Sequence, residues 1–112
     1  MPVLAIADMY GISGRRDELV AALADAEREA VARPGCVRYA FAATVADPDR
    51  FVLVGEWHDK AAMDAHYGSE SFARFQFALD GLLARPSEMT VYEVTGSVRP
   101  VASGPMDPRD AD

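Results

Sequence analysis

The segment FVLVGEW, residues 51–57, limits the possible folds most strongly, because it has the length of a strand and is apolar on both faces. Side chains alternate between the two faces of a strand. Residues 51, 53, 55 and 57 therefore share one face, and Val52 and Val54 occupy the other. Segment 3–11 (VLAIADMYG) has the same property, apart from Asp8. A sheet built from such strands needs cover on both faces, since exposed apolar surface costs roughly 25 cal/mol per Å².

Two helical segments and two further strands surround these two strands. Residues 15–33 repeat apolar side chains at helical spacing, and Pro34-Gly35 ends that helix. Segment 36–45 alternates as a strand, and an Asp- and Pro-rich turn at 46–50 joins it to 51–58 as a hairpin. Asp59 is a suitable N-cap for a second helix, which we expect to break near Gly68-Ser69, resume through residues 72–83 and end at Pro86. Residues 88–96 form the last predicted strand.

This order, βαββαβ, is the ferredoxin-like plan of the α+β class, in which two helices cover one face of a four-stranded antiparallel sheet. The second apolar face predicts a homodimer, in which the sheet of another copy covers it. We expect residues 1–99 to form the domain. Residues 100–112, rich in Pro, Asp and Gly, are expected to be a disordered C-terminal tail.

The composition argues against several classes of partner. Eleven basic and 18 acidic residues give a net charge of −7 and a pI near 4.7, which disfavours nucleic acid and anionic membrane surfaces. No segment is apolar enough to cross a bilayer, and the N-terminus lacks the features of a signal peptide. Cys36 is the single cysteine, so no disulfide framework or thiolate metal cluster is expected. These features indicate a cytoplasmic protein.

His66 is the first candidate for chemistry, because helical spacing places it beside Met63 on the inward face of the second helix. An imidazole that titrates near working pH can act as a general base or bind a ligand. The alternative is a core histidine with a backbone or hydroxyl partner. Trp57, at the end of its strand near the expected pocket mouth, is open to the same two interpretations, as a stacking surface for a flat ligand or as core packing.

Other polar residues give weaker indications. Glu56 and His58 lie on the strand face opposite Trp57, so they do not form a metal site with His66, and no metal is expected. Asp8 is either a perturbed carboxylate or close to the solvent-exposed strand end. Arg38 is expected to pair with an acid across the hairpin.

Two stretches resemble the antibiotic biosynthesis monooxygenase family: RPGCVRYAF, residues 33–41, and FVLVGEWHDKAAMDAHYGSESFARF, residues 51–75. They share a Pro-Gly-Cys turn into the second strand, a Glu-Trp pair at the end of the third, and Ala-His on the following helix. The resemblance extends over about residues 2–96. It implies a dimeric α+β barrel with a pocket between helices and sheet, and members that include cofactor-free oxygenases of quinols and polyketides, haem-degrading enzymes and an isomerase.

Carried over residue by residue, the resemblance is mixed. Trp57 matches the pocket tryptophan of polyketide oxygenases, but Leu53 stands where those enzymes have Asn and Met63 where they have Tyr. Haem degradation is disfavoured, because His66 replaces a Trp of the haem-degrading members, and Gln76 and Asp8 replace a His and an Asn.

The resemblance therefore implies a cofactor-independent monooxygenase that oxidises a quinol or polyhydroxy-aromatic substrate with O₂, without metal or flavin. His66 and Trp57 would be the catalytic residues in that enzyme. The expected substrate-binding residues are Leu53, Met63, Tyr67, Phe41, Phe72 and Phe75.

Two alternatives stay open. An isomerase of a small, phosphorylated sugar-like carbonyl compound would use the same imidazole and would need a cationic anchor, for which Arg38 and Arg74 are the candidates. A non-enzymatic dimer that binds a small ligand would retain His66 as a core residue.

Overall fold

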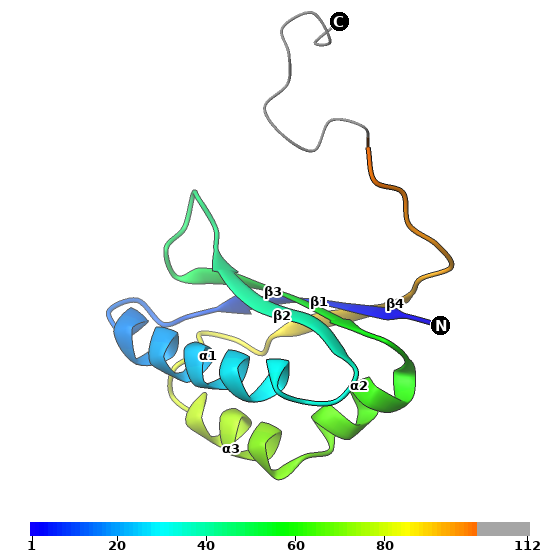
Figure 1. Ribbon diagram of the computed structural model, residues 1–112. Helices are drawn as coiled ribbons and strands as arrows, with labels where there is room; N and C mark the ends of the chain where they lie inside the picture. Colours follow the sequence, from blue (N-terminus) through cyan, green and yellow to red (C-terminus); the bar gives the residue numbers. More distant parts are fainter. Residues whose placement is uncertain (101–112) are drawn as a thin grey trace, which may run out of the picture.

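The computed structural model describes residues 1–100, so the predicted tail lies almost wholly outside the described residues. Its elements are β1 (Val3–Tyr10), α1 (Arg16–Val31), β2 (Cys36–Ala43), β3 (Arg50–Trp57), α2 (Lys60–Tyr67), α3 (Glu70–Ala78) and β4 (Glu88–Glu93). The strands form an antiparallel sheet in the order β2-β3-β1-β4. All three helices lie on one face of this sheet (Figure 1). The predicted α+β, ferredoxin-like fold is confirmed.

The two central strands alternate between buried and half-buried residues along their whole length. The helix-facing residues of β1 and β3 are Val3, Ala5, Ala7, Met9, Phe51, Leu53, Gly55 and Trp57, all buried. The outer face carries Leu4, Ile6, Val52 and Val54, which remain half-buried, and no second layer covers them within residues 1–100. The two-faced apolar pattern read from the sequence therefore corresponds to one covered face and one open face.

The second helical segment divides into two helices. Asp59 caps α2 as predicted, its carboxylate accepting a hydrogen bond from the Ala62 N–H at 2.8 Å. Ser69 then caps α3, its hydroxyl accepting from the Phe72 N–H at 3.2 Å and donating to the His66 carbonyl at 2.6 Å. This single hydroxyl joins the end of one helix to the start of the next, so it fixes the angle at which His66 is held over the sheet.

The prediction that this helix continues through residue 83 and ends at Pro86 is wrong, because α3 ends at Ala78. Gly81 has φ +77°, a backbone conformation that reverses the chain and that glycine adopts without strain. Leu82 is buried there, and its carbonyl accepts a hydrogen bond from the Ile12 N–H at 2.9 Å. The leucine spacing that suggested a helix comes from a turn that packs into the core.

The core consists of two clusters beneath the helices. One contains Trp57, Tyr39 and Met63 with the small residues of β1, and the other contains Phe51 with Leu19, Leu23, Leu79 and Leu82. Strand β4 lies at the sheet edge with all six residues exposed. Among residues 1–100, no helix has the length and apolar character needed to cross a bilayer.

Two glycines allow elements to approach closely. A Cβ on Gly35, which has φ +83°, would lie 2.6 Å from the Ala62 Cβ, so α2 packs directly against the turn between α1 and β2. A Cβ on Gly55 would lie 3.2 Å from the ring of Tyr39. The absence of a side chain at Gly55 therefore leaves the space that the rings of Tyr39 and Trp57 occupy.

Candidate functional site

A cavity of about 340 Å³ lies between the sheet and α3, where the two core clusters meet. Its walls come from β1, β2, β3, the end of α2 and α3, and its rim includes exposed residues of β4 and the preceding loop. The lining residues are Ala7, Met9, Tyr39, Phe41, Leu53, Tyr67, Phe72, Phe75, Gln76, Leu79, Ser87 and Met89. The volume lies at the lower end of the range of small-molecule sites, and the aromatic side chains suit a flat, apolar ligand.

The two tyrosines supply polar groups to this mostly apolar wall. Burial raises the pKa of Tyr39 and the pKa of Tyr67 above the ordinary value, so both phenols stay protonated at neutral pH. Their hydroxyls are close enough for each to influence the pKa of the other, but no hydrogen bond of good geometry joins them. The buried Tyr67 hydroxyl has no partner within residues 1–100, and it is therefore free to form a hydrogen bond with a ligand.

His66 lies behind this wall, in a box of aromatic rings. It is only 3% exposed, and it stacks on Trp57 with ring centroids 4.9 Å apart and an interplanar angle of 28°. Three more rings meet it edge-on: Tyr39 at 5.1 Å, Tyr67 at 4.8 Å and Phe72 at 5.4 Å. Neither ring nitrogen has a hydrogen-bond partner among the described residues.

Burial, together with a smaller effect of the nearby Arg33 guanidinium, lowers the pKa of His66 to about 4. The imidazole is therefore neutral at physiological pH, with one ring nitrogen carrying a free lone pair. A buried histidine with a purely structural role normally has a hydrogen-bond partner. Among residues 1–100, the two ring nitrogens of His66 lack such a partner.

The predicted site residues separate into two layers. Five of them line the cavity: Phe41, Leu53, Tyr67, Phe72 and Phe75. Trp57, His66 and Met63 lie in a second layer and are not among the lining residues. Trp57, expected near the pocket mouth, is completely buried, and its indole Nε1 has no partner within residues 1–100. It supports His66 from the sheet side instead of presenting a surface to the cavity.

Sequence reasoning missed several cavity residues. Tyr39 has the same strand spacing as Phe41 and could have been included on that ground. Ala7 and Met9 follow from the pairing of β1 with β3, because Ala7 stands opposite Leu53 and Met9 opposite Phe51. The sequence did not predict that Met89 lies at the cavity rim, since this depends on which strand lies at the sheet edge.

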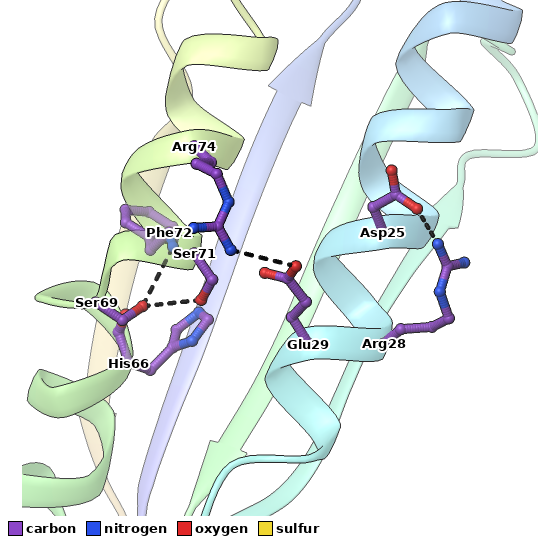
Figure 2. Close-up of polar contacts among 8 residues, drawn as sticks. All are labelled: Asp25, Arg28, Glu29, His66, Ser69, Ser71, Phe72 and Arg74. Atoms are coloured by element: carbon purple, nitrogen blue, oxygen red, sulfur yellow. Dashed lines mark hydrogen bonds and ion pairs between the residues drawn. The ribbon is translucent and has the colours of Figure 1, made fainter.

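The charged candidates lie elsewhere. Arg38 faces Glu56 across the hairpin at 3.8 Å, as expected, on the outer face of the sheet. Asp8 pairs with Arg50 at 2.8 Å on that same face. Arg74 points to Glu29, with 3.7 Å between Nη2 and Oε1, on the side of α3 that faces α1 (Figure 2). No three metal-binding side chains come together among residues 1–100.

The chain was compared with protein families and with known proteins. A family model described as antibiotic biosynthesis monooxygenase matches residues 2–77. The chain is 24% identical over 93 residues to an uncharacterized protein of Synechocystis, and the match covers 83% of this chain and 63% of that protein, so the chain spans less than two thirds of this relative's length.

Solved structures agree with the fold. A Mycobacterium tuberculosis protein superposes with a TM-score of 0.81 and 26% identity, over 88% of this chain and 100% of that one. A Deinococcus radiodurans protein, described as a proposed antibiotic biosynthesis monooxygenase, superposes with a TM-score of 0.82 and 18% identity. The match covers 87% of this chain and 96% of that one. A Pseudomonas aeruginosa protein superposes with a TM-score of 0.77 and 24% identity, over 85% of this chain and 95% of that one.

Proposed function

The chain belongs to the antibiotic biosynthesis monooxygenase family, and from this premise we propose that it oxidises a quinol or polyhydroxy-aromatic compound with O₂ without a metal or flavin. The observation that carries the proposal is the aromatic cavity beside a buried, neutral, unpartnered imidazole. An anionic quinol transfers an electron to O₂ directly, so the protein must bind the substrate, remove a proton and exclude water. A quinol and O₂ then give a hydroxyquinone and water, and no external reductant is consumed.

His66 is the general base in this proposal, and Tyr67 connects it to the substrate. The Tyr67 hydroxyl accepts a hydrogen bond from the substrate hydroxyl and donates to the free ring nitrogen of His66. No such bond to His66 exists in the ligand-free structure; it forms when the substrate enters, as catalytic hydrogen bonds commonly tighten in the substrate complex. Positioned proton transfer of this kind contributes about 10²–10⁴ in rate.

Oxygen uptake by metal-stripped protein tests the proposal. A panel of quinols and polyhydroxy-aromatics is supplied to the wild type, to His66→Gln and to His58→Gln. His58 is the exposed second histidine and serves as the matched control. We expect uptake by the wild type and the control, reduced about 100-fold or more in His66→Gln. Equal rates in all three proteins would remove His66 from the mechanism, and saturable binding without uptake would support the non-enzymatic alternative.

The isomerase alternative lacks an anion site at the cavity. Among the described residues, its lining includes no Arg or Lys. Arg38 is on the opposite face of the sheet, and Arg74 is paired with Glu29 between the helices. A phosphorylated substrate would have no cationic partner at the cavity wall, so we do not favour this reaction.

The outer face of the sheet supports a second proposal, that the protein is a homodimer through this face. Ile6 and Val54 stand opposite each other at its centre. Ion pairs lie toward its two ends, Asp8 with Arg50 and Arg38 with Glu56. An apolar centre with a polar rim is typical of protein interfaces.

Light scattering at micromolar concentration tests the dimer. We expect twice the chain mass for the wild type and a shift to monomer for Val54→Lys, which places a charge at the centre of the face. Ala21→Lys, at an exposed position of α1 on the helix side of the sheet, adds the same single charge away from the outer face and is the control. A monomeric wild type would refute the proposal.

A further inference from the structure

His66 borders a second, much smaller hollow on the side of the helices. This hollow, of about 10 Å³, is bordered by α1, the end of α2 and α3. Its lining is Ala26, Glu29, His66, Ser71, Phe72 and Phe75. About this much volume accommodates the centre of one water molecule, which also needs two to four polar partners. His66, Ser71 and Glu29 provide three.

The hollow continues outward into a groove between α1 and α3. The groove has a volume of about 180 Å³, and four residues line both it and the small hollow: Ala26, Glu29, Ser71 and Phe75. Figure 2 shows the imidazole of His66 pointing from the end of α2 into the space between α3 and α1, below Ser71 and toward Glu29. His66 therefore stands between an apolar cavity on one side and a polar path to solvent on the other.

The two polar side chains that line both the hollow and the groove, Ser71 and Glu29, have only loose contacts with their neighbours. The Ser71 hydroxyl lies 3.1 Å from the Ser69 hydroxyl, which fixes the start of α3. The Glu29 carboxylate is about half exposed, and its contact with Arg74 is a loose 3.7 Å. Glu29 and His66 both line the hollow, so a water held there lies next to both residues.

We propose that one water in this hollow, together with Ser71 and Glu29, forms the route by which the imidazole of His66 exchanges its proton with solvent. The proton accepted at one ring nitrogen is balanced by release of a proton from the other nitrogen to the water. The water passes a proton to Glu29, and Glu29 releases it to the groove. The imidazole is then neutral as its other tautomer. The starting tautomer returns when the first nitrogen gives up its proton and the second takes one back from the water, without opening the aromatic cavity.

The charged and titratable groups around the ring fit this direction of transfer. Arg33, beyond the end of α1, opposes a positive imidazole and so favours release of the proton. Tyr39 from β2 and Tyr67 from α2 face the ring with protonated phenols. Glu29 from α1 and Arg74 from α3 lie on the solvent side, and of these five groups only Glu29 is a carboxylate that can take up the proton.

The inference deepens the proposed function, but its test requires no substrate. NMR of the imidazole nitrogens measures how fast the ring N–H of His66 exchanges with water, with exposed His58 as an internal reference. We expect Glu29→Gln to slow the exchange about tenfold or more, Glu29→Asp to preserve it in part, and Ser71→Ala to slow it as well. Asp25→Asn is the matched control, because it removes a negative charge from the same helix face but leaves the hollow unchanged.

Two outcomes decide the matter. Slower exchange in Glu29→Gln and Ser71→Ala, with Asp25→Asn like the wild type, supports the route even if no oxygenase substrate is ever found. Exchange within about twofold of the wild type in all the variants overturns it, whatever the outcome of the oxygen-uptake experiment.

Discussion

The burial of a neutral His66 predicts that the protein loses stability in mild acid. An unfolded chain has an ordinary histidine with a pKa of 6.5, whereas burial lowers the pKa of His66 to about 4 in the folded protein. Between these two values the unfolded state binds a proton that the folded state does not. Stability from this group is therefore fully present above pH 6.5 and is lost as the pH falls toward about 4.

The magnitude follows from the shift itself. The two pKa values differ by about 2.5, which corresponds to about 3 kcal/mol in total. By about pH 5 the loss reaches about 2 kcal/mol, while most carboxylates are still ionised. This loss is a substantial fraction of the roughly 5–15 kcal/mol by which folded domains are normally stable.

Urea denaturation of the wild type, His66→Gln and His58→Gln at about pH 7.5 and about pH 5 measures this loss directly. We expect the wild type and His58→Gln to lose about 2 kcal/mol more than His66→Gln on acidification. The comparison uses the change with pH, so a lower overall stability of His66→Gln does not affect it. If all three proteins lose the same free energy, the imidazole is not held neutral in the folded state.

Two further substitutions test the cavity wall and the packing of α2 against the turn at Gly35. Tyr67→Phe removes a buried hydroxyl that has no partner within residues 1–100, so the ligand-free protein should gain about 1 kcal/mol of stability in urea denaturation. Ligand affinity measured by calorimetry should fall by up to about tenfold. A loss of stability would show that the hydroxyl has a partner. Gly35→Ala should lose about 1–3 kcal/mol in the same assay, because φ is +83° and the new Cβ would lie 2.6 Å from the Ala62 Cβ. Gly14→Ala, with φ +88° and open space around it, should lose less, and equal losses would remove the contact with α2 from the explanation.

The sequence predicted the fold well because the fold depends on local patterns. The apolar runs at 3–11 and 51–57, the helix end at Pro34-Gly35 and the Asp59 cap each act within a few residues, and together they determine the order of the elements. The helix end at Ala78 was missed because Leu79 and Leu82 keep a helical spacing while serving a turn. A positive φ at Gly81 is a consequence of packing against the start of the chain, which no local pattern records.

The site was predicted only in part, for a different reason. Helical and strand spacing placed His66, Phe72 and Phe75 on inward faces, but it does not tell how far each side chain lies from the cavity. Whether a ring lines a cavity or lies behind it depends on contacts between distant elements, such as the stack of His66 on Trp57 and the edge contact with Tyr39. The solvent-side path past Glu29 likewise arises only when α1 packs beside α3.

The most direct test of the proposed site is a map of where an aromatic substrate binds. A quinol from the active panel is added without oxygen, and methyl NMR signals are followed on both faces of the sheet. We expect saturable shifts at Met9, Leu53 and Leu79, which line the cavity, with little change at Ile6 and Val54 on the outer face. Shifts confined to the outer face, with the cavity methyls unmoved, would contradict the assignment of the cavity as the reaction site.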